Sequence, residues 1–219
     1  MKANAQSGLG VRAQQAQQTR QKILKAAIKV FAKSGFAGGR VDSISKLAKS
    51  HDRMIYYYFG SKEKLFVEVL ETLYEQFNEA ERRLQLDTTD PVAALSRIVD
   101  FTWRYYLTHP EFVALLGSEN LHRGIHVKKS VNVKSMSDAT LSMLQPVLEA
   151  GQAQGLFRED ISVRNLYLMI ASLGYFYNSN RYTLSSFLGE NLMTDDALVD
   201  WQAFITDAVL RKVCIDTSA

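Results

Sequence analysis

The chain has 219 residues, of which 47% are hydrophobic and 22% are charged, and these values exclude a disordered or fibrous protein. The single cysteine, Cys214, cannot form an internal disulfide, and residues 1–9 lack the apolar core of a signal peptide. The longest charge-free apolar stretch, residues 165–180, is shorter than the ~18–20 residues that a membrane span needs, so we expect a cytoplasmic protein with no membrane association.

The net charge of +3 is distributed unevenly along the chain. Residues 1–66 contain thirteen Lys and Arg residues against three acidic ones, so this segment carries +10 and the remainder carries −7. No acidic residue precedes Asp42. Such an asymmetry indicates a head that binds a polyanion, attached to an acidic body.

The N-terminal third is predicted to contain an arm and three helices. Residues 1–18 are Gln/Ala-rich and basic, and we interpret them as a flexible arm that extends the first helix, contacts DNA or takes no part. A helix then begins at Thr19, a suitable N-cap, and is expected to stop at Gly35. Two short helices, at about 41–48 and 52–58, follow with a turn between them. This arrangement predicts a helix-turn-helix whose second helix enters a major groove of DNA.

The remainder of the chain is predicted to be helical throughout. Ser61 can cap a helix that runs to about Leu86, and Asp90-Pro91 can begin another that ends near His109. Further helices are expected at about 111–122, 135–155, 162–184 and 194–214, and Ser162 and Thr194 are suitable N-caps for the last two. The fold class is therefore all-α, with a basic arm (1–18), a helix-turn-helix DNA-binding domain (19–66) and a larger helical ligand-binding and dimerisation domain (67–219).

The head resembles that of the TetR/AcrR family of bacterial transcriptional regulators. The similar residues are Thr19-Arg20-x-x-Ile23-Leu24-x-Ala26-Ala27, Phe31…Gly35-Phe36, Val41…Ile44…Ala48 and, above all, Ile55-Tyr56-Tyr57-Tyr58-Phe59-x-Ser61-Lys62-Glu63-x-Leu65. The resemblance covers about the first third of the chain and implies a DNA-binding regulator. Where the family usually has a glycine in the turn, this chain has Lys49, and a positive φ at that residue would cost on the order of 1 kcal/mol.

Candidate DNA contacts cluster on the two short helices and on the start of the next one. Arg53 is suited to a bidentate contact with guanine, and Met54 to contact with a thymine methyl group. Consecutive helical residues fan out by about 100°, so Tyr56, Tyr57 and Tyr58 cannot all face inward, whereas Ile55 and Phe59 belong to the core. Lysines in the first turn of a helix oppose its macrodipole, and a bound phosphate would explain them. The predicted DNA-binding residues are Arg40, Ser43, His51, Asp52, Arg53, Met54, Tyr56, Tyr57, Lys62 and Lys64.

The body has the composition expected of a small-molecule sensor. Aromatic and thioether side chains at helical spacing can line an apolar cavity, and Asn178 and Arg181 can bind a carboxylate or carbonyl group. Ordinary core packing, or bonds to backbone or a partner subunit, is the alternative for each of these residues. The predicted effector-binding residues are Trp103, Tyr106, His122, Arg123, Met143, Tyr175, Asn178 and Arg181.

Glu119, His122 and His126 form a candidate metal site, since their spacing places all three near one face of a helix. Two features count against it: Glu119 and Arg123 are spaced for an ordinary ion pair, and Gly124 is expected to end the helix before His126. We therefore expect neither a metal nor another cofactor. No catalytic motif is present, so an enzyme is not expected either.

The last two helices are candidates for a dimer interface. Ala171 and Gly174 would permit close approach, and an apolar stripe follows along the last helix: Trp201, Phe204, Ile205, Val209 and Leu210. Packing within one chain would satisfy the same stripe. We expect a homodimeric repressor that binds a palindromic double-stranded DNA operator and is released by a small organic effector. The alternative function is an all-α metal- or small-molecule-binding protein without a DNA role.

Overall fold

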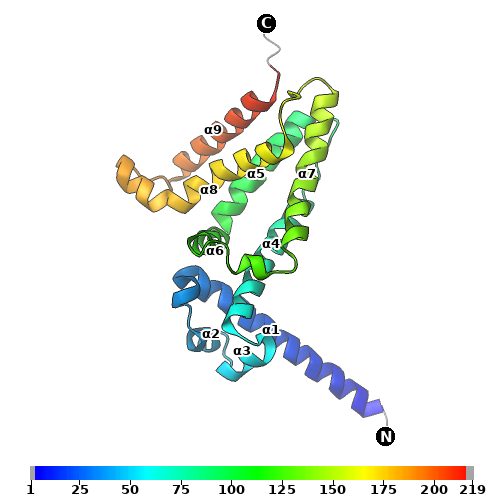
Figure 1. Ribbon diagram of the computed structural model, residues 1–219, viewed down its shortest axis with the longest axis vertical. Coiled ribbons are helices and arrows are strands. Elements are labelled where there is room, and N and C mark those ends of the chain that lie inside the picture. The colour runs from blue at the N-terminus through cyan, green and yellow to red at the C-terminus, as the bar shows by residue number, and fades with distance from the viewer. Residues whose placement is uncertain (1–2, 216–219) are drawn as a thin grey trace. The chain divides into compact units, whose positions relative to one another are not determined.

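The computed structural model describes the backbone of residues 3–215 and the side chains of residues 13–132 and 141–215. In this part of the chain all regular elements are helices, and one isolated β-bridge joins Phe157 and Cys214. The predicted all-α fold is confirmed (Figure 1). Two compact units can be distinguished, and each is described separately.

Unit 1 comprises the chain up to Leu73 together with Ala114–Val131. Its core is formed by apolar side chains from several helices, including Ile23, Phe31, Ile44, Ile55 and Phe66. Its elements are α1 (Ala3–Gly38), α2 (Val41–Leu47), α3 (Asp52–Phe59), the first part of α4 (Lys62–Arg82), the last part of α6 (Pro110–Leu121) and the short 3₁₀ helix η1 (Val127–Lys129).

The first helix begins earlier than the sequence suggested. α1 continues through the arm to Ala3, and the hydroxyl of Thr19 donates to the carbonyl of Gln15 at 2.9 Å. Thr19 therefore lies inside the helix, and its assignment as an N-cap was wrong. Gln and Ala are good helix formers and the arm contains no proline, so the helix continues through it. At the other end, Gly35 has a φ of 65° and interrupts the helical backbone, as predicted.

The two short helices lie where they were predicted. α2 and α3 are joined by residues 48–51, and both Ile55 and Phe59 are buried. Gly39, just before α2, meets the ring of Phe31 so closely that an added Cβ would lie 2.3 Å from Cδ1 of that ring. Only glycine can occupy this approach of α2 to α1.

Unit 2 comprises Tyr74–Val113 and the chain from Asn132 onward. Its elements are the second part of α4, α5 (Pro91–Thr108), the start of α6, α7 (Val133–Ala153), α8 (Val163–Leu188) and α9 (Asp195–Val213). α5 contacts α7, α8 and α9, while α8 and α9 lie side by side (Figure 1). The predicted N-caps are confirmed: Asp90, Ser162 and Thr194 accept from the backbone N–H groups of Ala93, Asn165 and Ala197 at 3.0, 3.2 and 3.3 Å.

The apolar stripe on α9 is divided between the core and the surface. Ile205 and Val209 are buried in the core of unit 2, whereas Phe204 is exposed. A Cβ at Gly174 would lie 3.0 Å from the ring of Tyr106, so this glycine permits close approach within the chain. Assigning Ile205, Val209 and Gly174 to a dimer interface was therefore wrong.

Residues 114–131 belong to unit 1, although the sequence placed them in the body. Ser118 approaches Gly35, and the ring of His126 lies 4.3 Å from that of Phe36 and 4.9 Å from that of Phe66, measured between centroids. These contacts with α1 and α4 explain the grouping.

Among the residues that the structure describes, no helix is long and apolar enough to cross a membrane.

Candidate functional site

The turn between α2 and α3 sets the direction of the predicted reading helix. Lys49 has a φ of 51°, which lies in the left-handed region. This is the conformation expected from the glycine that the family usually has at this position. The backbone N–H of Ser50 donates to the carbonyl of Ser45 at 2.9 Å. The buried Ser45 also donates its hydroxyl to the carboxylate of Asp52. Asp52 therefore fastens the start of α3 to α2.

The outer face of α3 presents cationic and aromatic side chains. Arg53 is exposed, and Tyr57 is 76% exposed. Tyr56 is exposed as well, so the expectation that at least one tyrosine of the run faces solvent is confirmed. Met54 is half-buried, and His51 lies exposed at the N-cap position without a capping bond. This face can reach base edges, while the opposite face is committed to the core.

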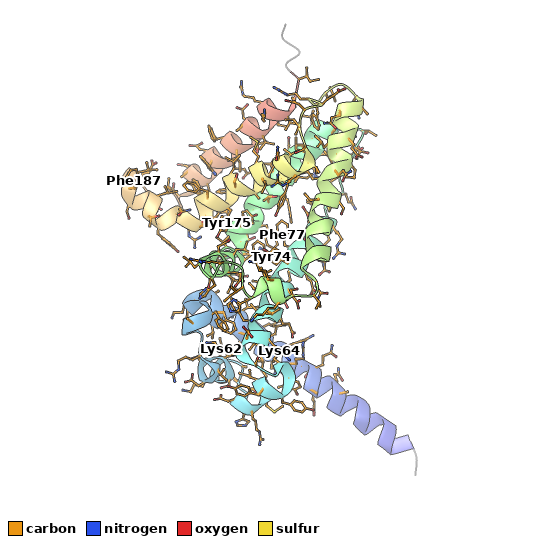
Figure 2. All side chains as sticks on the ribbon, viewed as in Figure 1. Lys62, Lys64, Tyr74, Phe77, Tyr175 and Phe187 are labelled. Atoms are coloured by element: carbon orange, nitrogen blue, oxygen red, sulfur yellow. The ribbon has the colours of Figure 1, made fainter. Side chains whose placement is uncertain are left out.

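The predicted phosphate-binding residues differ in their exposure and in the contacts that they already make within the protein. Lys62 lies 4.7 Å from the centroid of the Phe36 ring, and burial lowers the pKa of its ammonium group. Lys64, two residues later, is exposed (Figure 2). Arg40 donates to Asp42 at 3.0 Å, and this bond holds the pKa of the Asp42 carboxyl below its usual range. Ser43 is half-buried. Of these residues, Lys64 is therefore the most accessible to a phosphate group.

Sequence reasoning missed a basic groove in unit 1. Four lysines from α1 and the turn surround it, and its full lining is Lys22, Lys25, Ala26, Lys29, Leu47, Ala48 and Lys49. The signal was present in the spacing of the three lysines of α1, which recur on one helical face. A groove with this charge suits a phosphate backbone.

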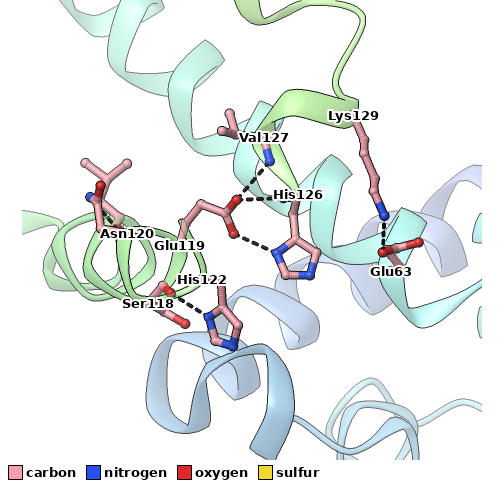
Figure 3. A network of polar contacts seen from close by, with 9 residues as sticks. Glu63, Ser118, Glu119, Asn120, His122, His126, Val127 and Lys129 are labelled. Atoms are coloured by element: carbon pink, nitrogen blue, oxygen red, sulfur yellow. Dashed lines mark hydrogen bonds and ion pairs between the residues drawn. The ribbon is translucent and has the colours of Figure 1, made fainter. Parts of the chain in front are cut away.

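Glu119 lies at the centre of a buried network rather than in a metal site (Figure 3). Its Oε1 accepts from the backbone N–H of His126 at 2.7 Å and from that of Val127 at 3.0 Å, and its Oε2 lies 2.7 Å from Nδ1 of His126. His122 is engaged elsewhere, with Nδ1 2.7 Å from the carbonyl of Ser118. Among the described residues no group of three or more His, Cys, Asp or Glu side chains is arranged to hold a metal.

The ion pair expected between Glu119 and Arg123 is replaced by this network. α6 ends at Leu121, before Gly124 as predicted, and Arg123 has a φ of 58°. Arg123 therefore no longer follows Glu119 by one helical turn. A second contact joins the same segment to α4, since Lys129 donates to Glu63 at 2.5 Å.

Unit 2 contains a small enclosed cavity. It is lined by Phe77, Glu81, Ile98, Thr102, Leu144, Tyr167, Ile170 and Ala171. Glu81 is only 4% exposed, and burial raises the pKa of its carboxyl to about 7. Sequence reasoning missed Glu81, although an acidic residue one turn after Phe77 on the apolar face of α4 was a usable signal.

The predicted effector-binding residues are dispersed. Trp103 and Tyr106 are buried on α5, while His122 and Arg123 lie in unit 1. Asn178 donates to the carbonyl of Gly174 at 2.9 Å, and Arg181 donates to the carbonyl of Asn178 at 2.8 Å. Tyr175 lies on α8 with its ring 6.3 Å from that of Tyr106, and Met143 is half-buried on α7. None of the eight residues is among those that line the cavity around Glu81, so their binding roles stay predictions.

Comparisons with known proteins match both parts of the chain. Residues 23–69 match the family model described as bacterial regulatory proteins of the tetR family, and residues 91–209 match the one described as a tetracyclin repressor-like C-terminal domain. The HTH-type transcriptional repressor NicS of Pseudomonas putida is 60% identical over 202 residues, which are 92% of this chain and 95% of that protein.

Solved structures share the fold. A TetR family transcription regulator from Marinobacter aquaeolei superposes with a TM-score of 0.66 at 17% identity, covering 92% of this chain and 98% of that one. The transcriptional regulator FadR from Bacillus subtilis, solved in complex with stearoyl-CoA, gives a TM-score of 0.61 at 17% identity over 88% of this chain and 98% of its own.

Proposed function

Because the chain belongs to the TetR family of bacterial transcriptional regulators, we propose that it is a repressor that binds a palindromic operator as a homodimer. A small organic effector in the body releases it from the DNA. The exposed face of α3, held by the contact between Ser45 and Asp52, is the observation that carries this proposal. The proposed repressor has no enzymatic activity, and it acts in the cytoplasm, where the DNA is located.

DNA docking uses α3 and the basic surface of unit 1. α3 enters the major groove, where Arg53 reads a guanine and Tyr56 and Tyr57 approach bases and backbone. Lys64 and the groove around Lys25 neutralise phosphates. The +10 charge of residues 1–66 favours this mode, and binding should weaken as salt is raised.

Dimerisation uses the exposed apolar side chains of α8 and α9. Phe176 and Phe204 are both more than half exposed, and Phe187, near the C-terminal end of α8, is 85% exposed (Figure 2). Large apolar side chains in this state mark an interaction surface. Two copies that pair these helices form a four-helix interface with two-fold symmetry, which matches a palindrome whose half-sites lie about 34 Å apart.

Electrophoretic shift and fluorescence anisotropy on the DNA upstream of the chain's own gene test the proposal. We expect sequence-selective binding by the protein without effector, with affinity that falls steeply between about 50 and 200 mM salt. A scrambled duplex of equal length is the control. If the two duplexes bind equally, or neither binds, the regulator proposal fails and the alternative of an all-α small-molecule binder without a DNA role gains support.

A further inference from the structure

We propose that Glu81 recognises the effector and that the effector carries an N–H hydrogen-bond donor, either an ammonium group or a ring N–H. This inference rests on the proposal that the body binds an effector, and it names the chemical class of that effector. It is carried by a buried carboxylate at a cavity wall, where a ligand can supply the missing donor.

The carboxyl group of Glu81 is buried at the wall of the cavity. Glu81 is 4% exposed, and in the part of the chain that the structure describes its side chain has electrostatic interactions with the hydroxyls of Tyr106 and Tyr167 but no hydrogen bond or ion pair. A buried carboxylate without a donor is costly, because desolvation is not offset by any bond. A ligand that donates to Glu81 offsets this cost and stabilises the ionised form of the carboxyl group.

The cavity around Glu81 is lined mainly by apolar and aromatic side chains. Its lining contains no Lys, Arg or His, and Glu81 is the one acidic residue in it. The hydroxyl of Thr102 donates to the carbonyl of Ile98 at 2.9 Å and is occupied. The rings of Phe77 and Tyr167 offer faces to a flat ligand or a cation. The hydroxyl of Tyr167 is a further polar group of the lining, and it can donate or accept. An N–H donor on an apolar ring finds an acceptor in Glu81 and a packing surface in the aromatic rings.

The cavity around Glu81 is small. Its free space is about 10 Å³, room for about one water molecule. A ring-sized ligand must therefore separate the helices that contribute the lining: α4, α5, α7 and α8. Occupation of the cavity and rearrangement of unit 2 are thus the same event, which is what an effector site requires.

Binding to the full-length protein without DNA tests the inference by calorimetry with two matched pairs of probes. Benzylammonium, a charged donor, is compared with benzoate, and 2-pyridone, a neutral N–H donor, is compared with N-methyl-2-pyridone. We expect at least one donor to bind about 10-fold more tightly than its match. The pair that shows the difference tells whether the donor is charged or neutral.

Variants then assign the effect to one side chain. Glu81→Leu, which has no acceptor, should lower the affinity for the preferred donor by about 10-fold or more. Glu81→Gln is nearly isosteric and removes only the charge. It should therefore change the affinity for 2-pyridone by less than about 3-fold but lower the affinity for benzylammonium about 10-fold. Glu79→Gln, an exposed neighbour on α4, is the control and should bind as wild type. Circular dichroism confirms that each variant is folded.

Three results would overturn the inference: no preference for the donor in either pair of probes, donor binding unchanged in both Glu81 variants, or tighter binding of the non-donor in both pairs. None of them depends on DNA. A protein that binds the donors through Glu81 but no operator would refute the regulator proposal and leave this inference standing.

Discussion

Glu119, in the last turn of α6, holds His126 at both its backbone and its ring. Oε1 lies 2.7 Å from the backbone nitrogen of His126, and Oε2 lies 2.7 Å from Nδ1 of the same residue. Both side chains are buried, and the imidazole packs between the rings of Phe36 and Phe66. The segment after α6 is thereby fixed against α1 and α4 within unit 1.

Replacing Glu119 by Ala should destabilise the protein by about 3 kcal/mol, because the ring of His126 and the backbone N–H groups of His126 and Val127 lose their partner. Urea unfolding followed by circular dichroism measures the change. Glu79→Ala, which removes an exposed ion pair with Arg83, is the control and should cost less than about 1 kcal/mol. Equal losses in the two variants would show that the Glu119 network adds no stability.

Lys49 can be tested by a pair of substitutions that remove the same charge. Glycine adopts a φ of 51° without strain, whereas alanine adopts it at a cost, so Lys49→Gly should be more stable than Lys49→Ala by about 1 kcal/mol. Thermal unfolding of the two variants measures the difference. An alanine variant as stable as the glycine variant would mean that the turn carries no strain.

Arg53→Ala and Lys64→Ala should weaken DNA binding in different ways. The first should reduce discrimination at one base pair by about 1–3 kcal/mol, while the second should weaken all duplexes alike and lower the salt slope by about 1. Anisotropy titrations on operator and single-mismatch duplexes at several salt concentrations separate the two. Lys212→Ala, on α9, is the control. If Arg53→Ala kept full selectivity, another residue would be the base reader.

Glu81 should make stability depend on pH. Burial raises the pKa of its carboxyl from 4.5 to about 7, so the folded state holds a proton that the unfolded state releases. Its contribution is complete below pH 4.5 and is lost as pH rises through about 7, for a total of about 3 kcal/mol. The free energy of unfolding, measured from pH 4.5 to 8, should therefore fall more in wild type than in Glu81→Gln. Parallel profiles would contradict the shift.

Phe204→Glu should convert the dimer into a monomer, since it places a charge in the exposed apolar surface of α8 and α9. Sedimentation velocity at micromolar concentration gives the oligomeric state. Phe204→Tyr keeps the ring without adding charge and should remain dimeric. A dimeric Phe204→Glu variant would place the interface elsewhere.

Local chemistry was sufficient to predict most helices from the sequence. The caps at Asp90, Ser162 and Thr194 depend on hydrogen bonds to residues three positions away, so the sequence contains both partners. The same holds for the burial of Ile55 and Phe59, which follows from helical spacing. Thr19 failed as a cap because the preceding Gln/Ala-rich residues are equally able to form a helix.

The sequence by itself therefore determined the helices, the helix-turn-helix and which residues of α3 face away from the core. The tertiary structure decided which apolar residues of α9 pack within the chain, that Glu119 bonds His126 rather than Arg123, and that Glu81 is enclosed. An amphipathic stripe looks the same whether its partner is this chain or a second copy, and a carboxylate can find its partner across a turn. Burial and pairing of this kind depend on which helices meet in space, which local spacing does not specify.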